Sequence, residues 1–546
     1  MSALVRVEGL RVSFGSGGAA HTVVEGVGFE LAPGECVALV GESGSGKSVS
    51  ARSLLGLVGA GSRVRADTLE IDGQDARTFS ERRWRGIRGR RIGYILQDAL
   101  SSLDPLRTVG KEVQEAISAT GGPRGRAGRA RALELLGRTH VPDPETRIDE
   151  RPAQLSGGQR QRALIATALA GDPAVLIADE PTTALDVSVQ KQILELFGEL
   201  KAEGIALLLI SHDLAVVSQL ADRVLVLQGG AVVEAGTTAE VLSRPEHPYT
   251  RSLIEAAPRF EVGPADASAE AGSLSAPGSL SVPGSLSLSK GPAPEASEAS
   301  DIVLAAENVS KTFAVRGGAV RHAVKDVSIA VRRGRSVGVV GESGSGKTTL
   351  ARILAGFTTA DSGTVRRASD DPRDVQFVYQ DPGSSFDPRW TVGRLLDEAI
   401  ALRHPDFGRS ERTARVRDWL ERVGLSADFA DRRPSSLSGG QRQRLGIARA
   451  LAVEPAVVVL DEPVSALDVA VQKQILELIA RLQAETGVGY LFISHDLGVI
   501  QKVCDTVVVL QGGEVREAGP TSQVLRAPAD EYTRLLIDAV PSLPAF

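Results

Sequence analysis

Two glycine-rich segments contain a lysine and a hydroxyl group at the spacing that suits phosphate binding. The segment Gly41-Glu-Ser-Gly-Ser-Gly-Lys47 recurs letter for letter at residues 341–347, and a hydroxyl residue follows each copy, Ser48 in the first and Thr348 in the second. Glycines allow successive backbone N–H groups to turn inward around phosphate oxygens, and the N-terminus of a following helix adds positive potential. The pattern Gly-x-x-x-x-Gly-Lys-Ser/Thr therefore predicts two sites for nucleotide phosphates, in which the hydroxyl groups also bind Mg²⁺.

Both repeats have a hydroxyl residue after the lysine, but Val49 stands where the second copy has Thr349, and we expect this missing hydroxyl to be the one asymmetry near the phosphates. A missing hydroxyl contact is worth about 1 kcal/mol, so we expect the first loop to keep its phosphate site. The predicted loop contacts are Gly41, Ser43, Gly44, Gly46, Lys47, Ser48, Val49, Gly341, Ser343, Gly344, Gly346, Lys347, Thr348 and Thr349.

Each repeat also contains an acidic pair. Asp179-Glu180 and Asp461-Glu462 each follow a run of four apolar residues. The aspartate is placed to hold Mg²⁺ through water, and the glutamate, one residue further on, could polarise an attacking water. An acidic pair at a strand end can instead cap a helix, but a phosphate loop earlier in the same repeat favours the catalytic interpretation.

A glutamine and a histidine complete the polar set in each repeat. Gln97 and Gln380 lie between the phosphate loop and the acidic pair, where an amide could contact Mg²⁺ and the water. His212 and His495 occur in Ile-Ser-His-Asp-Leu after the next apolar run, which favours a contact with the terminal phosphate over a structural role. The predicted catalytic residues are Glu180, Glu462, His212, His495, Gln97 and Gln380, and the predicted Mg²⁺ ligands are Ser48, Gln97, Asp179, Thr348, Gln380 and Asp461.

The elements that must position these residues are short apolar strands. Runs rich in Val, Ile and Leu occupy 37–40, 175–178 and 207–210, and again 337–340, 457–460 and 490–493. Continuous apolar strands suit a parallel sheet that is covered on both faces. Helical stretches such as 189–201 and 471–484 separate the strands, so the sequence predicts an α/β fold with a mostly parallel central sheet.

The motifs occur in the same order in both halves, and each copy is about 250 residues long, which is too long for a solenoid repeat. The sequence therefore predicts two homologous domains, 1–260 and 301–546. Residues 261–300 between them contain ten Ser, eight Ala, five Gly and five Pro. Such a segment buries too little apolar surface to offset its ordering entropy, so we expect a flexible linker.

Composition excludes several classes of protein. Apolar residues make up 42% of the 546 residues. The net charge is −6, so the chain lacks the overall positive charge that would indicate nucleic-acid binding. Cys36 and Cys504 are the two cysteines, too few for a disulfide framework, and Cys36 is expected in the core. No apolar run approaches the roughly 20 residues of a spanning helix, and the N-terminus does not resemble a secretory signal.

A further segment of each repeat reads Leu-Ser-Gly-Gly-Gln-Arg-Gln-Arg, at residues 155–162 and 437–444. Together with the loops, acidic pairs, glutamines and histidines, it resembles the motif set of ATP-binding cassette (ABC) ATPases, in which this segment is the signature. The resemblance covers both repeats almost end to end. It implies two P-loop NTPase domains that bind ATP and Mg²⁺, each with a mostly parallel core sheet and a helical subdomain.

The resemblance further implies that the signature of one domain completes the ATP site of the other within one chain. By analogy, Lys47, Glu180 and His212 pair with Ser438 and Gly440, and Lys347, Glu462 and His495 pair with Ser156 and Gly158. The implied signature and interface contacts are Ser156, Gly157, Gly158, Gln159, Asp186, Ser438, Gly439, Gly440, Gln441 and Asp468. Phe14 and Phe313 match the aromatic residue that stacks on adenine, with core packing as the alternative.

A narrower resemblance concerns the ATPase subunits of dipeptide, oligopeptide and nickel importers. The segment Ala178-Asp-Glu-Pro-Thr-Thr-Ala-Leu-Asp186 and its continuation look like theirs, as does the tail Pro245-Glu-His-Pro-Tyr-Thr250; the second repeat has the degenerate tail Asp530-Glu-Tyr-Thr533. Some relatives carry a cysteine cluster after this tail. Because the chain has no cysteine between Cys36 and Cys504, we expect no iron–sulfur cluster.

This resemblance implies the energy-coupling subunit of an importer, peripheral at the cytoplasmic face of the membrane. Its expected partners are two integral-membrane permease subunits and, indirectly, an extracytoplasmic binding protein, with no nucleic acid. The alternative is a soluble twin-cassette ATPase that acts on ribosomes or nucleic acid, but the Pro/Gly/Ser-rich linker argues against it. Peptides are the expected substrate, and nickel chelates, glutathione and opines are alternative substrates.

Overall fold

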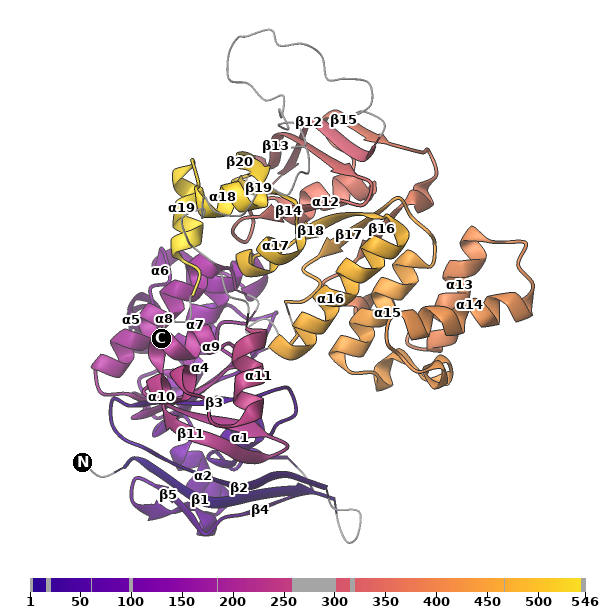
Figure 1. The fold of residues 1–546 in the computed structure, drawn as a ribbon. Helices are drawn as coiled ribbons and strands as arrows, with labels where there is room; N and C mark the ends of the chain where they lie inside the picture. The colour runs from indigo at the N-terminus through magenta and orange to yellow at the C-terminus, as the bar shows by residue number, and fades with distance from the viewer. Residues whose placement is uncertain are drawn as a thin grey trace. The chain divides into compact units, whose positions relative to one another are not determined.

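The computed structural model describes residues 3–15, 21–59, 61–97, 102–183, 185–257, 301–314, 320–465 and 467–541. The chain folds into two compact units, one formed essentially by residues up to Ala257 and one by later residues. Each unit has its own sheets and helices (Figure 1). The predicted linker 261–300 lies outside the described residues, so the domain boundaries stay a prediction.

A six-stranded, mostly parallel sheet forms the centre of the first unit, in the order β11-β10-β3-β9-β8-β7. Five strands are parallel, and β11 pairs antiparallel with β10 at the edge. The strands are β3 (Cys36–Val40), β7 (Ile92–Ile95), β8 (Val175–Asp179), β9 (Ala206–Ile210), β10 (Arg223–Gln228) and β11 (Ala231–Thr237). Every residue of β3, β8 and β9 is buried, as expected for parallel strands with both faces covered.

Helices cover this sheet and extend from it. Leu, Ile and Val side chains of α8 and α9 pack with α4, α5 and α7 on one face of the sheet in a single apolar cluster. The helices are α1 (Lys47–Ser53), α2 (Glu81–Ile87), α4 (Val109–Ala119), α5 (Gly125–Arg138), α6 (Pro144–Arg147), α7 (Gly157–Ala168), α8 (Val187–Ala202), α9 (Leu214–Leu220), α10 (Thr238–Ser243) and α11 (Pro248–Ala256). The predicted helical subdomain corresponds to α4 through α7.

A second, antiparallel sheet covers the other face of the unit, and the sequence analysis did not predict it. It is formed by β1 (Val5–Phe14), β2 (His21–Leu31), β4 (Ser62–Arg65), β5 (Thr68–Ile71) and β6 (Gln74–Asp75). The buried residues of β1 and β2 pack with α1 and the parallel sheet in one cluster. In Figure 1 these strands lie at the opposite end of the unit from α5 and α6.

The second unit repeats this architecture. Its central sheet has the order β16-β17-β18-β14-β19-β20, again parallel apart from the β20 edge, and its antiparallel sheet has the order β13-β12-β15. The strands are β12 (Ile302–Ala314), β13 (Val320–Arg332), β14 (Ser336–Val340), β15 (Ser362–Arg367), β16 (Val375–Val378), β17 (Val457–Asp461), β18 (Gly489–Ile493), β19 (Thr506–Gln511) and β20 (Glu514–Pro520).

The helices of the second unit are α12 (Lys347–Ala355), α13 (Val392–Arg403), α14 (Arg409–Arg422), α15 (Gly439–Leu451), α16 (Val469–Thr486), α17 (Leu497–Val503), α18 (Thr521–Arg526) and α19 (Glu531–Asp538). Between β15 and β16 the chain forms a single short 3₁₀ turn, Pro372–Asp374, where the first unit has β6 and α2. This difference accounts for the shorter spacing between the first two motifs of the second repeat.

The predicted fold class is confirmed, since both units have a mostly parallel core sheet and a group of helices beside it. All six apolar runs predicted as strands belong to the two central sheets, and Cys36 is fully buried, as expected. Among the helices of the described ranges, none combines the length and the apolar character that crossing a bilayer requires.

Candidate functional site

Each glycine-rich loop connects the central strand of its sheet to a helix. The first loop follows β3 and ends at Gly46, whose φ of 94° lies in the left-handed region directly before α1. A Cβ at Gly41 would stand 2.2 Å from the Leu227 carbonyl oxygen, and one at Gly46 would stand 2.8 Å from the Val23 carbonyl oxygen. The loop therefore needs glycine at these positions both for its backbone conformation and for its space.

The second loop has the same shape. Gly346 has a φ of 105°, and a Cβ at Gly341 would stand 2.1 Å from the Leu510 carbonyl oxygen. The tips of both loops are exposed to solvent: Ser43, Gly44, Ser343 and Gly344.

The two loop lysines are buried beneath the loops. The Lys47 Nζ donates hydrogen bonds to the carbonyl oxygens of Gly41, at 2.6 Å, and Glu42, at 2.8 Å. The Lys347 Nζ makes the same two bonds in the second unit, both at 2.8 Å. Burial lowers the pKa of Lys47, and the carboxylates of Glu180 and Asp179 oppose that shift. Each lysine is thus held under its loop by carbonyl groups, within reach of any anion that the loop binds.

A hydroxyl group and a carboxylate converge beside each loop. The Ser48 Oγ donates to Asp179 Oδ1 at 2.8 Å, and the Thr348 Oγ1 donates to Asp461 Oδ1 at 3.4 Å. Hydroxyl and carboxylate oxygens are the hard donors that Mg²⁺ prefers, so the residues present fit the ion that the sequence predicts.

The two carboxylates have different surroundings. Asp179 is fully buried, and its Oδ2 accepts a second hydrogen bond of 2.8 Å from the Tyr94 hydroxyl. Burial and the Asp179 charge raise the pKa of Tyr94 to about 12, so the phenol keeps its proton. In the second unit Phe377 occupies the position of Tyr94. Burial, together with the Glu462 charge, raises the pKa of Asp461 to about 6.

The expectation that Val49 and Thr349 form the one asymmetry near the phosphates is therefore wrong. Tyr94 is the third residue of β7 and pairs with Ile177, and Phe377 is the third residue of β16 and pairs with Val459. A polar residue within an otherwise apolar strand, three positions before Gln97, was the signal that could have revealed the difference.

The predicted catalytic glutamate of the first unit is held by three side chains. Gln97 Nε2 donates to Glu180 Oε2 at 2.8 Å, Thr183 Oγ1 donates to the same oxygen at 3.2 Å, and His212 Nδ1 lies 3.4 Å from Oε1. Glu180 also has a φ of 49°, a left-handed conformation that costs about 1–3 kcal/mol in a residue other than glycine. The strand end and the surrounding contacts thus fix both the backbone and the carboxylate.

The second unit builds the same group. Gln380 Nε2 donates to Glu462 Oε2 at 2.9 Å, and His495 Nδ1 lies 3.2 Å from Oε1. Glu462 has a φ of 48°, and Ser465 replaces the threonine. The structure thus brings together the glutamine, glutamate and histidine that the sequence placed on three separate segments of each repeat.

Electrostatics in these groups favours charged glutamate and charged histidine. Burial acts to raise the pKa of Glu180, but the hydrogen bond and charge of His212 and the charge of Lys47 outweigh it, so the pKa lies below its ordinary value. Burial acts to lower the pKa of His212, and Glu180 outweighs it, so that pKa is raised. Glu462 and His495 shift in the same directions for the same reasons.

The signature segments form the N-termini of long helices. Ser156 caps α7: its Oγ accepts from the Gln159 N–H at 3.3 Å, and the Gln159 side chain accepts from the Ser156 N–H at 3.0 Å. Ser438 and Gln441 form the same capping box at α15. These polar side chains therefore have a local role in addition to any contact with nucleotide.

The two glycines of each signature differ in the space around them. A Cβ at Gly157 would have Leu185 Cδ2 as its nearest contact, at 3.6 Å, whereas a Cβ at Gly158 would stand 2.5 Å from Val189 Cγ1. In the second unit the corresponding distances are 3.5 Å for Gly439, to Leu467, and 2.5 Å for Gly440, to Val471. The first glycine of each pair thus leaves room for a side chain, and the second is required for packing.

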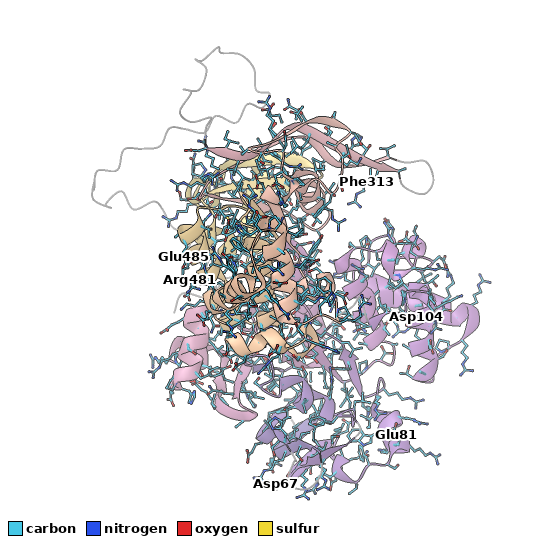
Figure 2. All side chains as sticks on the ribbon, turned by 90° about the vertical axis from the view of Figure 1, so that its right-hand side faces the viewer. Asp67, Glu81, Asp104, Phe313, Arg481 and Glu485 are labelled. Atoms are coloured by element: carbon cyan, nitrogen blue, oxygen red, sulfur yellow. The ribbon has the colours of Figure 1, made fainter. Side chains whose placement is uncertain are left out.

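The two aspartates and two phenylalanines that the family resemblance implied as interface and adenine contacts lie at or near the ends of helices and strands. Asp186 caps α8 through a 3.0 Å bond from the Val189 N–H to its Oδ1, and Asp468 directly precedes α16. Phe14 is half-buried against the core at the end of β1. Phe313 is 46% exposed near the end of β12, where Figure 2 labels it. The exposed Phe313 ring has Lys311 Nζ 5.8 Å from its centroid, whereas Phe14 is partly engaged in core packing.

One further contact with the phosphate loops was not predicted from the sequence. The Glu42 N–H donates to the hydroxyl of Tyr249, on α11, at 2.9 Å, and the Glu342 N–H donates to the hydroxyl of Tyr532, on α19, at 3.1 Å. Both tyrosines belong to the tail segments that resemble peptide importers. The tail of each unit therefore contacts the phosphate loop of that unit directly.

Comparison with known proteins identifies the family. The model of the ABC transporter family matches residues 24–183 and 324–465. The model of the oligopeptide/dipeptide transporter C-terminal region matches residues 233–280 and 516–545.

Several relatives match the chain over almost its whole length. The peptidoglycan transport ATP-binding protein YejF of Agrobacterium fabrum is 40% identical over 99% of this chain and 97% of its own length. The oligopeptide transport ATP-binding protein OppD of Mycobacterium bovis is 38% identical over 99% of both chains. The glutathione import ATP-binding protein GsiA of Shigella sonnei is 38% identical over 98% of this chain and 89% of its own length.

Among solved structures, an archaeal ribosome recycling factor in complex with a ribosomal stalk protein is similar, with a TM-score of 0.59 and 21% identity over 93% of this chain and 90% of that one. At this identity the likeness shows the fold alone. The two family models and the full-length relatives together show that the chain belongs to the ABC transporter family, as an ATP-binding protein with two ABC ATPase cassettes.

Proposed function

We propose that this chain is the ATP-hydrolysing, energy-coupling subunit of an importer of dipeptides or oligopeptides. The observation that carries the proposal is the repetition of one complete constellation in both units. In each unit a buried loop lysine, a hydroxyl–carboxylate pair and a glutamate held by glutamine and histidine meet at the strand ends of the central sheet. The match of both tails to the oligopeptide transporter region supports the substrate class.

In the first cassette the loop N–H groups and Lys47 would bind the β- and γ-phosphates of ATP, with Lys47 exchanging its carbonyl bonds for phosphate oxygens. Ser48 and Asp179 would hold Mg²⁺, with Gln97 beside them, and the bound ion would offset phosphate charge. Thr348, Asp461 and Gln380 would do so in the second cassette. Phe14 and Phe313 would stack on adenine.

Glu180 and Glu462 would polarise the attacking water. A general base acts as its ionised form, and the lowered pKa of both glutamates keeps them ionised at neutral pH. His212 and His495 would hold the carboxylates in place and contact the γ-phosphate. The left-handed backbone at each glutamate accompanies a carboxylate that is held by the glutamine and histidine of its own cassette.

We further propose that each site is completed by the signature of the other cassette, as the family resemblance implies. Ser156, Gly157 and Gly158 would face the ATP held by Lys347, and Ser438, Gly439 and Gly440 would face the ATP held by Lys47. Asp186 and Asp468 would take part in the shared interface. The N-terminus of a long helix, with its unpaired N–H groups, suits an anion such as the γ-phosphate.

The proposed partners are two permease subunits, so the chain would act at the cytoplasmic face of the membrane, with an extracytoplasmic binding protein delivering the substrate. The relatives' names include peptidoglycan, oligopeptide and glutathione. Peptides and peptide-like compounds are therefore the transport substrates to test first. No iron–sulfur cluster is proposed, because the chain contains two cysteines and such clusters take about four cysteine ligands.

The experiment is affinity purification of the tagged full-length chain from detergent-treated membranes, followed by identification of bound proteins and by Mg²⁺-dependent ATPase assays with and without peptides and a binding protein. Transport predicts recovery of two integral-membrane proteins and ATPase stimulation by loaded binding protein. Recovery with ribosomes and without membrane proteins would instead support the alternative function.

A further inference from the structure

Among the described residues of the first cassette, Asp179 has the most completely enclosed carboxylate. Its exposed fraction is 0%. Ser48 occupies one of its oxygens, at 2.8 Å, and the Tyr94 hydroxyl occupies the other, also at 2.8 Å. Because the side chain is fully enclosed, removal of either donor leaves one carboxylate oxygen without its present hydrogen bond.

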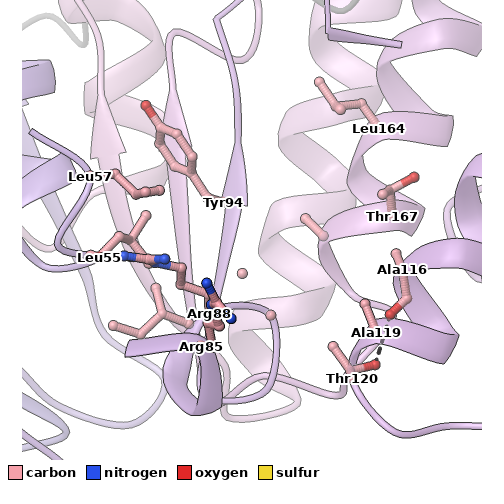
Figure 3. A pocket seen from close by; sticks show the side chains of 14 residues that line it. Leu55, Leu57, Arg85, Arg88, Tyr94, Ala116, Ala119, Thr120, Leu164 and Thr167 are labelled. Atoms are coloured by element: carbon pink, nitrogen blue, oxygen red, sulfur yellow. Dashed lines mark hydrogen bonds between the residues drawn. The ribbon is translucent and has the colours of Figure 1, made fainter. Parts of the chain in front are cut away.

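Tyr94 is itself held in a donating orientation. Arg52 Nε donates to the phenolic oxygen at 3.2 Å. A phenol has one proton, and since its oxygen accepts from Arg52, that proton is left for Asp179. Figure 3 shows the Tyr94 ring on the wall of a pocket of about 490 Å³, with its hydroxyl at the end away from Arg85 and Arg88. The Tyr94 hydroxyl thus reaches from β7 to Asp179 at the end of the neighbouring strand β8.

The second cassette offers a natural comparison. Phe377 stands at the same register position and packs against Tyr379 and Phe357, with ring centroids 4.7 Å and 5.6 Å apart. Its ring has no hydroxyl to donate. Asp461 keeps one hydrogen bond from a hydroxyl, Thr348 at 3.4 Å, and is partly exposed.

We propose that Tyr94 is a positioning residue for the Mg²⁺-binding carboxylate of the first cassette, and that its replacement by Phe377 makes the second site bind Mg²⁺ more weakly. This inference rests on the proposed function. With Oδ2 fixed by Tyr94, the Asp179 carboxylate is held in one rotational orientation and presents Oδ1 beside the Ser48 hydroxyl. Without that bond the carboxylate must rotate or leave a buried charged oxygen unpaired.

The expected size follows from the type of bond. A buried hydrogen bond to a charged group is worth enough to change an equilibrium constant about tenfold or more. Tyr94→Phe should therefore weaken metal binding at the first site about tenfold. Phe377→Tyr should strengthen it at the second site by several-fold, because the added hydroxyl has the partly exposed Asp461 to bind.

The experiment measures metal binding directly. Mn²⁺ replaces Mg²⁺, and its dissociation constant is determined by electron paramagnetic resonance with the full-length chain saturated in a non-hydrolysable ATP analogue. Lys347→Ala confines the analogue to the first site and Lys47→Ala confines it to the second. Analogue affinity in EDTA and thermal unfolding are measured in parallel, because a merely structural role would change these as well.

The proposal predicts weaker Mn²⁺ binding in Tyr94→Phe at the first site, tighter binding in Phe377→Tyr at the second, and unchanged analogue affinity in EDTA. Equal Mn²⁺ affinity in Tyr94→Phe and the parent would overturn it. If Tyr94→Phe fails to fold, an unchanged second site in Phe377→Tyr overturns it equally. A chain that binds no analogue at either site would refute the proposed function itself.

Discussion

Replacement of Gly157 by aspartate separates the role of the signature in folding from its role in the ATP site. Gly157 is the first residue of α7, and a Cβ there has its nearest contact at 3.6 Å, so an aspartate fits within its own cassette. A carboxylate at a helix N-terminus is favourable by about 0.3–1 kcal/mol. We therefore expect Gly157→Asp to fold with unchanged or slightly higher stability.

The effect on nucleotide should be large and confined to one site. If the new carboxylate stands about 5 Å from a γ-phosphate oxygen, the repulsion at an effective dielectric constant of about 20 is about 3 kcal/mol, or roughly two orders of magnitude in affinity. Under cross-pairing, this loss falls on the ATP held by Lys347. Gly439→Asp should mirror the result at Lys47, because the space around Gly439 is equivalent.

The assay is vanadate trapping of a photoactivatable ATP in the assembled complex, followed by cleavage at a protease site placed in the linker, so that label in each half is counted separately. Gly157→Ala is the matched control, with a side chain and no charge, and should trap nearly normally. Gly158→Ala should instead lower stability, because its Cβ would stand 2.5 Å from Val189 Cγ1. Equal loss at both sites in Gly157→Asp, or loss at Lys47 alone, would refute the cross-pairing.

Three further predictions concern the tail, the linker and the histidines. Tyr249→Phe removes the hydroxyl that accepts from the Glu42 N–H and should weaken ATP binding at the first loop several-fold; an unchanged dissociation constant would contradict a tail-to-loop link. Replacement of 265–298 by a Gly/Ser-rich segment of equal length should leave the ATPase rate of the assembled complex nearly unchanged, because the predicted linker would serve only to keep the two cassettes at a high effective concentration; a large loss would indicate a docking role. Glu180 raises the pKa of His212 in the folded state. The contribution of charged His212 to the free energy of unfolding should therefore be fully present below about pH 6.5 and be lost as the pH rises through the folded-state pKa. Urea unfolding of the nucleotide-free chain should show this loss, and His212→Gln should reduce it.

The sequence predicted the parallel sheets because their strands are buried on both faces and read as uninterrupted Val, Ile and Leu. The same reasoning failed for the antiparallel sheets. In β1 buried and exposed residues alternate irregularly, and its pairing with β2 contains register shifts. The length and pairing of β1 and β2 depend on how they pack over α1. A local sequence pattern does not contain that information.

The candidate site was predictable where chemistry is tied to motif spacing. Glu180, Gln97 and His212 come from three segments, and the common edge of a parallel sheet brings them together as expected. Tyr94 escaped prediction because its role depends on the distance to Asp179 across neighbouring strands. The left-handed backbone at Glu180 was equally unpredictable, since tertiary contacts impose it on a residue that does not favour it.

Both cassettes should hydrolyse ATP with their own glutamate, and single-turnover hydrolysis tests this most directly. Glu180→Gln and Glu462→Gln each keep the size of the side chain but remove the carboxylate, and general-base catalysis contributes about 10²–10⁴-fold. Each variant should slow steady-state turnover strongly while hydrolysing one ATP at the unaltered site, and the double variant should retain two unhydrolysed ATP. Should either single variant keep the full steady-state rate, that glutamate is not catalytic and the claim of two working sites is wrong.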